Sequence, residues 1–142
     1  MKNLTLGVNK KNYADTTILQ SVVPTQEELD EGQVVLCVKE FSFTANNITY
    51  AAMGETLRYW EFFPTEQGQG VIPVWGFADV IASRCEGVEV GEKFYGYYPM
   101  ATHVVVEPTR ISKASFIDGV SHRQPLSLIY NQYIRCSEDP LY

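Results

Sequence analysis

The chain has 142 residues, of which 45% are hydrophobic, 20% charged and 13% aromatic, and its formal net charge is −6. This composition is typical of one globular domain with an ordinary core, and it excludes a disordered segment. The eleven Lys and Arg residues are dispersed along the sequence, so no basic stripe is available to neutralise phosphates, and nucleic acid is not an expected partner.

The cysteine pattern and the hydropathy indicate a cytoplasmic protein. Cys37, Cys85 and Cys136 are far apart, form no C-x-x-C motif and have no histidine at metal-ligand spacing. We interpret them as free thiols in a reducing compartment. No apolar run is long enough for a membrane span, and no apolar signal core follows Met1, so we expect no membrane partner.

In chain order, the first half predicts two strands and a long loop. Residues 16–23 form the first predicted strand, and 24–32 form an acidic turn. The next strand, 33–43, is apolar on both faces along most of its length, which places it inside a sheet or barrel. Residues 53–70 are rich in aromatic side chains but have no clear period, so they predict a loop with at most one helical turn.

The second half is dense in short strands. Residues 71–83 predict a strand interrupted at Pro73 and Gly76, which suit a bend or a barrel corner. Two further strands follow at 92–99 and 101–108. Short strands at this spacing, with glycine and proline between them, are typical of a small barrel or sandwich.

The tail has a different pattern. Apolar and aromatic residues recur with the spacing i, i+3, i+4, i+7 and i+8, which predicts one face of an amphipathic helix over 125–135 that begins near Pro125. These residues are Leu126, Ile129, Tyr130, Tyr133 and Ile134. The predicted helix ends without a capping glycine or a following element, an unexpected place for a complete protein to stop.

Several motifs carry a family resemblance. The run GVEVGEKFYG at 87–96 and the run ATHVVV at 101–106 resemble the GroES-like N-terminal domain of medium-chain dehydrogenases and reductases of the quinone oxidoreductase type. The family has a Pro-x-x-x-Gly motif before this region. Here Pro73 and Gly76 correspond to it, but two residues separate them instead of three. The whole chain is similar to a group within the superfamily described as a domain of unknown function, and the shared phrases are TANNITYA, YWEFFP, PVWGFA and YNQY.

The resemblance implies a mainly β fold, a partly open GroES-like barrel with short helices, to which we add the predicted C-terminal amphipathic helix. It implies a substrate-side domain at 1–124, and a helical tail at 125–142 that leads toward a nucleotide-binding domain. That domain is not encoded here, because no G-x-G-x-x-G follows a strand. We therefore expect NADP or NAD in an intact homologue, no tight cofactor binding by this chain, and either a truncated fragment or a different role.

The resemblance also argues against zinc. Zinc-dependent members of the superfamily use a cysteine and a His-Glu pair in this domain. This sequence has Phe43-Thr44-Ala45-Asn46 at the first position and Trp75-Gly76 at the second. We expect no zinc, so hydrogen bonds would have to activate a carbonyl.

The candidate polar residues of the site are two amides and a phenol. In the resembling reductases an asparagine after this strand lies near the nicotinamide, so Asn46 and Asn47 are predicted to contact the cofactor. The alternative is a turn, in which asparagine caps its own loop. Tyr50 is the candidate catalytic acid, because a phenol can protonate an enolate or donate to a carbonyl. Its alternative role is core packing.

An aromatic wall is predicted around the substrate. Its alternative role is to pack the mouth of the barrel. The wall residues are Tyr59, Trp60, Phe63, Trp75 and Tyr97. His103 is predicted to be structural because it lies alone on a strand. His122 with Arg123 is predicted to form a solvated turn, and the alternative is contact with a cofactor phosphate or a neighbouring domain.

The leading hypothesis is the substrate-side domain of a zinc-independent NAD(P)H-linked oxidoreductase-like protein that is inactive as this isolated chain. A small molecule is the expected partner. The alternative is a binding or interaction module that retains only the barrel. If a partner domain is missing, its absence exposes apolar surface, and we expect self-association into a homo-oligomer.

Overall fold

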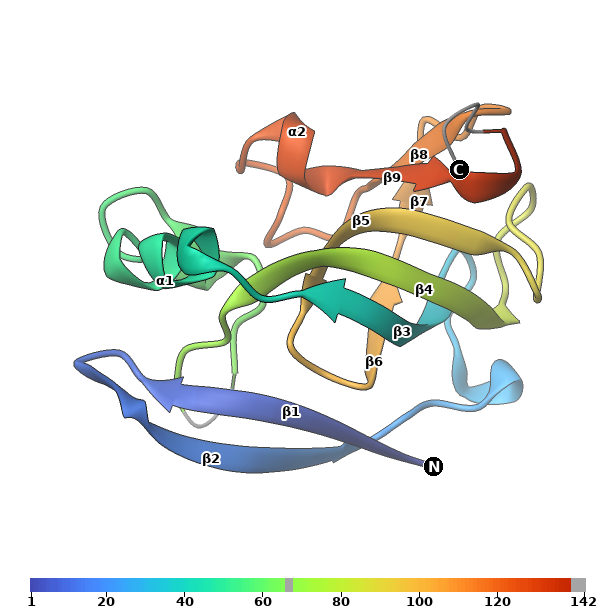
Figure 1. The fold of residues 1–142 in the computed structure, drawn as a ribbon. Coiled ribbons are helices and arrows are strands. Elements are labelled where there is room, and N and C mark those ends of the chain that lie inside the picture. Colours follow the sequence, from blue (N-terminus) through green and yellow to red (C-terminus); the bar gives the residue numbers. More distant parts are fainter. Residues whose placement is uncertain (66–67, 139–142) are drawn as a thin grey trace.

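The computed structural model describes residues 1–65 and 68–138, and its centre is a seven-stranded antiparallel sheet with the strand order β6-β3-β4-β5-β9-β8-β7. The two outermost strands are consecutive in the chain and are separated by Glu107. The sheet therefore curls until its ends approach each other, which makes a nearly closed barrel (Figure 1). Its strands are β3 (Val34–Ser42), β4 (Pro73–Ser83), β5 (Lys93–Pro99), β6 (His103–Val106), β7 (Pro108–Thr109), β8 (Ser115–Asp118) and β9 (Gln132–Arg135).

Strand alternation decides which side chains fill the barrel. Along β4, Val74, Ala78 and Val80 are buried, whereas Trp75 and Phe77 between them are half-buried on the outer face. The core is built in the same way from every strand. Its buried members include Val34, Leu36, Phe94, Tyr98, Val106, Phe116 and Tyr133. The mainly β, barrel-like fold predicted from the sequence is confirmed.

Two facing glycines, one on β4 and one on β5, allow close packing: one makes room for a ring and the other for the neighbouring backbone. Gly76 on β4 lies opposite Gly96 on β5. A Cβ on Gly96 would overlap the ring of Tyr133, which occupies this space, and a Cβ on Gly76 would overlap the β3 backbone at Glu40. The β3–β4 register also shifts between Val38 and Glu40. Gly76 thus lies within a continuous strand, beside an irregularity in its neighbour.

A separate hairpin covers one end of the barrel. It consists of β1 (Lys2–Asn9) and β2 (Asn12–Val22), and it lies below the barrel in Figure 1. The backbone of β1 joins the hairpin to the barrel: the amide of Leu6 donates to the carbonyl of Met100 at 2.9 Å, and that of Thr102 donates to Leu4 at 2.9 Å. The predicted strand at 16–23 is the second half of β2. β1 was not predicted, because its polar residues and Gly7 weaken the strand pattern.

The asparagine segment forms a helix that the sequence analysis missed. Helix α1 (Ala45–Ala52) begins at its N-cap, Thr44. The Thr44 hydroxyl accepts from the amide of Asn46 at 3.2 Å, and the Thr44 amide donates to Oδ1 of Asn47 at 2.6 Å. This is a capping box in which asparagine takes the place usual for glutamate or glutamine. A short 3-10 helix, η2 (Tyr59–Glu61), follows in the predicted loop. Two others are η1 (Gln26–Glu28) and η3 (Cys136–Glu138).

The predicted helix over 125–135 is wrong for most of its length. The helix α2 covers only Leu128–Asn131, and the chain continues directly into β9. β9 lies between β5 and β8, where Ile134 pairs with Tyr95 and Tyr133 pairs with Phe116. The boundary predicted at 124/125 therefore cuts through residues that share one sheet. The last part of the predicted helical tail, residues 139–142, lies outside the described residues.

The cause of this error is an ambiguous pattern. Tyr and Ile favour strands as much as their spacing favours a helix, and pairing with two neighbouring strands decides between the two conformations.

The helices of the structure are short. Within residues 1–65 and 68–138, none is long and apolar enough to cross a bilayer.

The packing at Gly96 yields a stability prediction. Gly96→Ala places a methyl group against the Tyr133 ring, and overpacking of a filled core costs about 1–3 kcal/mol. Chemical denaturation with fluorescence detection will measure the loss. Val90→Ala is the control, because Val90 is 60% exposed and its truncation is expected to change stability by less than about 0.5 kcal/mol. Equal stability of the two variants would contradict the packing described above.

Candidate functional site

An aromatic cluster gathers on the outer face of the barrel. Its five members come from five different elements, α1, η2, β4, β5 and α2. Ring centroids lie 4.8 Å apart between Tyr50 and Tyr59, 4.9 Å between Trp75 and Tyr97, and 4.8 Å between Tyr97 and Tyr130. We call these five residues, Tyr50, Tyr59, Trp75, Tyr97 and Tyr130, the aromatic wall. Tilted and edge-on packing at these distances is the favourable arrangement for rings.

Hydrogen bonds orient the polar ends of the wall. The indole Nε1–H of Trp75 donates to the Tyr50 hydroxyl at 3.2 Å, and the hydroxyls of Tyr59 and Tyr130 lie 3.3 Å apart. Tyr97 is fully buried, and its hydroxyl has no hydrogen-bond partner among the described residues. Burying a hydroxyl without a hydrogen-bond partner is unfavourable, so the Tyr97 hydroxyl would gain the most from a hydrogen bond to a ligand.

The surroundings in the wall raise the pKa of two of its phenols. Burial raises the pKa of Tyr97, and the nearby Tyr50 and Tyr130 act in the same direction. The hydrogen bond with Tyr59, followed by burial, raises the pKa of Tyr130 to about 12. At neutral pH Tyr97 and Tyr130 are therefore hydroxyl donors and not bases. The surface can therefore pack against a flat apolar group and donate to a carbonyl oxygen.

The structure brings together some of the predicted site residues and separates others. Tyr50, Tyr59, Trp75 and Tyr97 meet in the wall, and Phe63 lies behind it, 6.3 Å from Tyr97 between ring centroids. The sequence analysis missed Tyr130 as a site residue, because it was assigned to the face of a longer helix. The YNQY phrase was the available signal.

Trp60 lies apart from the wall. It packs with Val8, Ala51 and Ile72 in a small core under the β1–β2 hairpin. There it fills the space left by two glycines, since a Cβ on Gly54 or on Gly70 would overlap its indole.

The two predicted cofactor contacts have different surroundings. Asn47 is 3% exposed, and its Nδ2 donates to the carbonyl of Pro73 at 2.9 Å. With Oδ1 in the capping box, both ends of this amide are used inside the domain. Asn46 is exposed on the first turn of α1. Only the Asn46 side chain is therefore available to a ligand without breaking a hydrogen bond.

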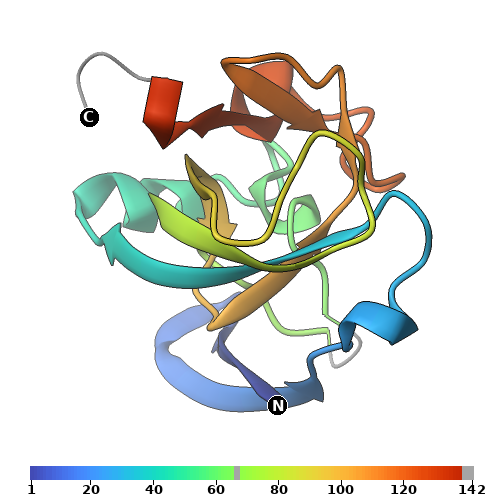
Figure 2. The same ribbon diagram turned by 90° about the vertical axis from the view of Figure 1, so that its right-hand side faces the viewer.

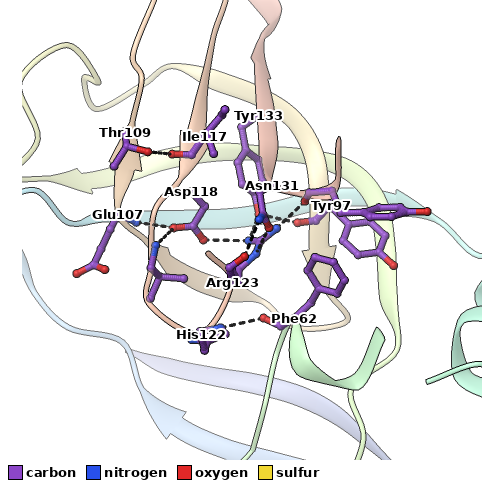
Figure 3. A network of polar contacts seen from close by, with 12 residues as sticks. Phe62, Tyr97, Glu107, Thr109, Ile117, Asp118, His122, Arg123, Asn131 and Tyr133 are labelled. Carbon is purple, nitrogen blue, oxygen red and sulfur yellow. Dashed lines mark hydrogen bonds and ion pairs between the residues drawn. The ribbon is translucent and has the colours of Figure 1, made fainter. Parts of the chain in front are cut away.

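A buried ion pair stands behind the wall (Figure 3). Arg123 and Asp118 each have a side chain 1% exposed, and Nη1 of the arginine lies 3.0 Å from Oδ2 of the aspartate. The guanidinium also donates to Asn131 Oδ1 at 2.8 Å, to the Tyr133 hydroxyl at 2.7 Å and to the Tyr130 carbonyl at 2.6 Å. The solvated turn predicted for Arg123 is therefore wrong.

The remaining atoms of this network are also satisfied. Oδ1 of Asp118 accepts from the amides of Glu107 and Val120, each at 3.0 Å. The Tyr133 hydroxyl donates to the carbonyl of Tyr97 at 2.6 Å, which ties the network to the strand that carries the wall. Burial raises the pKa of Tyr133 to about 12, although the neighbouring guanidinium opposes the shift.

Two hollows border these clusters. One, of about 400 Å³, lies between the β1–β2 hairpin and the barrel and is lined by His103, Asp118 and Arg123 among others; of the predicted wall residues it touches only Phe63. The other, of about 280 Å³, lies beside the wall and is lined by Trp75, Tyr95, Ile129, Gln132 and Ile134. No group of three or more His, Cys, Asp or Glu side chains that could hold a metal ion occurs in 1–65 and 68–138.

Comparison of the sequence with family profiles now identifies the chain. Residues 41–142 match the family described as "Protein of unknown function (DUF2855)". The chain belongs to this family. The matched part contains every member of the aromatic wall and the whole Arg123 network. No curated protein matches the DUF2855 chain.

Solved structures share the fold of this DUF2855 member. CurA from Vibrio vulnificus is 16% identical with a TM-score of 0.51, over 84% of this chain and 32% of that one. The CurF ER cyclopropanase from the curacin A biosynthetic pathway is 15% identical with a TM-score of 0.53, over 89% of this chain and 37% of that one. The quinone oxidoreductase from Coxiella burnetii is 14% identical, with a TM-score of 0.45, over 92% and 40%.

The first two likenesses show that this chain shares the fold of the matched parts of CurA and of the CurF ER cyclopropanase. The DUF2855 chain spans about a third of the length of these two structures.

The buried ion pair predicts a large effect of mutation. Arg123→Met leaves Asp118 buried without its cation, which costs about 3–5 kcal/mol, and we expect Asp118→Asn with Arg123→Met to lose less than the two single variants summed. Urea denaturation will measure each variant. Lys113→Met is the control because its side chain is 85% exposed. An Arg123→Met protein as stable as this control would contradict the network.

The raised tyrosine pKa values predict alkaline instability. A tyrosine in the unfolded chain has a pKa of about 10, whereas Tyr130 and Tyr133 in the folded chain have values of about 12. The folded state holds these protons more tightly, so their contribution to stability is complete below pH ~10 and is lost as the pH rises toward ~12. Denaturation at a series of pH values, with tyrosinate absorbance, tests this. The urea-unfolded chain is the reference, and normal ionisation of all tyrosines while the chain stays folded would refute it.

Proposed function

We propose that this chain is the substrate-side domain of a zinc-independent NAD(P)H-linked oxidoreductase-like protein, and that the aromatic wall faces the substrate. The observation that carries the proposal is the wall itself: the phenols of four tyrosines and the indole of Trp75 are held together on the outside of the barrel. Aromatic rings that are partly exposed to water at this position are unfavourable unless another group covers them.

The proposed ligand is a flat or acyl-type molecule with a carbonyl. Trp75 and Tyr95, whose rings are stacked with centroids 5.8 Å apart, provide an apolar side, and the adjoining hollow provides room. The Tyr50 hydroxyl accepts from Trp75 and retains its own proton to donate. Tyr50 therefore has the hydrogen-bonding capacity for the proposed general acid.

The fit to a nicotinamide cofactor is partial. The exposed amide of Asn46, beside the wall on α1, has the donor and acceptor needed to orient a carboxamide. The described residues contain no Gly-rich turn that opens a helix to hold a pyrophosphate. When bound in an intact homologue, the nicotinamide would supply the hydride. This chain would supply only the substrate side.

A second candidate is a binding module without catalysis. The packing of Tyr130 against Tyr97 favours it, because the chain's own side chain occupies part of the wall. In that case Ile129, which is 67% exposed beside the wall, would contact a partner.

Enzyme assays on the complete reading frame that contains this chain will distinguish the two candidates. We expect NADPH or NADH to bind and to be oxidised by a quinone or enone probe. Tyr50→Phe is expected to lower kcat by about 10²–10⁴-fold with little change in cofactor affinity. Tyr13→Phe is the control, because Tyr13 packs on Trp60 away from the wall. Absence of cofactor binding by the complete protein would defeat the oxidoreductase proposal and favour the binding module.

A further inference from the structure

The outer edge of β2 is a row of unpaired backbone groups. β2 has a single neighbour in its sheet, β1. The amide of Val23 donates to the carbonyl of Met1 at 2.9 Å, and β1 and β2 pair antiparallel with an unbroken register from Lys2↔Val22 to Val8↔Thr16. Because hydrogen-bonded and non-bonded pairs alternate in an antiparallel ladder, Leu19 and Ser21 bond to β1. The N–H and C=O groups of Thr16, Ile18, Gln20 and Val22 therefore point away from β1.

The opposite side of the hairpin gives an independent check of this assignment. Leu4, Leu6 and Val8 are the partners of Gln20, Ile18 and Thr16 across the ladder. Their backbone groups bond outward, to Thr102, Met100 and Gly70 at 2.8–2.9 Å. The edge of β1 is thus occupied by the barrel. In the described residues, no backbone or side-chain partner occupies the matching edge of β2.

This edge lacks the features that usually protect a strand. Residues 16–23, TTILQSVV, contain no charged residue and no proline, although the chain as a whole carries a net charge of −6. Ile18 is 57% exposed, Val22 is 78% exposed, and Leu4 beside them on the same face is 40% exposed. Exposed edges normally carry lysine, proline or a bulge that prevents pairing with another chain. The β2 edge is open to strand addition.

We propose that β2 pairs antiparallel with β2 of a second copy of this chain, which joins two hairpins into one four-stranded sheet about a twofold axis. A register centred on Leu19 would pair Ile18 with the partner's Gln20, and Thr16 with the partner's Val22. The outward groups supply both donors and acceptors, so the edge is complementary to itself.

Charge is the reason for preferring a second copy as the occupant. Two identical acidic chains repel each other over most of their surfaces, but at residues 16–23 they meet without any like charge. The exposed side chains of Ile18 and Val22 would also gain cross-strand neighbours on the same face of the new sheet, which cover part of their apolar surface. This surface differs from the apolar surface on which the sequence analysis based self-association.

Amide exchange will test the proposal on the wild-type chain. The amides of Leu19 and Ser21 should be protected at every protein concentration. Those of Ile18, Gln20 and Val22 should exchange fast in dilute solution and slow by about tenfold or more as the chain dimerises, with sedimentation measuring the dimer in the same samples. A chain that stays monomeric, or a dimer in which these three amides still exchange fast, overturns the proposal. Protection of all five amides in the monomer also overturns it, since another segment would then cover the edge.

A pair of variants gives the second test. Ile18→Lys places like charges across the proposed pairing and should abolish the dimer without loss of the folded circular dichroism spectrum. Val90→Lys adds the same charge at a residue that is also exposed, by 60%, but lies far from β2 in the sequence, and it should dimerise as the wild type does. Equal dimerisation of the two variants would overturn the proposal.

Discussion

The pairing of Arg123 with Asp118 is the interaction on which the closed form of this barrel depends. One guanidinium, buried beneath the sheet end, connects the end of β8, the segment after it, the α2–β9 junction and β5 through Tyr133. Removing two charges from water is costly unless every remaining donor and acceptor is used. Here Asp118 also accepts two backbone amides, one of them from Glu107 at the junction of β6 and β7. The ends of the curled sheet are therefore held by the same carboxylate.

The aromatic wall is a consequence of that network. Tyr130 reaches Tyr97 because its own carbonyl is bound to Arg123 and because Asn131 is bound in turn to the Arg123 carbonyl. The rings of Phe62 and Phe63 complete the connection, with the guanidinium 5.5 Å and 5.0 Å from their centroids. A cation over aromatic faces is a favourable contact in a desolvated site. The polar network thus positions an apolar surface without contributing a charge to it.

The two surfaces proposed to bind other molecules, the aromatic wall and the outer edge of β2, lie in separate regions of the structure. Tyr50 lies on α1, and Ile129 and Tyr130 lie on α2. Both helices are separated from the β1–β2 hairpin, which lies below the barrel and carries the open edge of β2 (Figures 1 and 2). A ligand or domain on the wall would therefore leave the hairpin edge accessible. The two surfaces also differ in chemistry, since one offers side-chain rings and the other offers backbone donors and acceptors.

The fold class, the central strands and the abundance of aromatic side chains could be predicted from the amino-acid sequence, because alternating β-branched residues, glycine turns and family motifs are local signals. The sequence did not predict α1, whose capping box uses an unusual asparagine, nor the depth of Arg123, since burial of a charge depends on partners far along the chain. The strand at residues 132–135 depends on contacts with distant parts of the chain. The spacing of apolar residues there suits a helix, but β5 and β8 offer backbone hydrogen-bond partners on both sides of the segment. These partners favour the strand, and the local sequence does not reveal them.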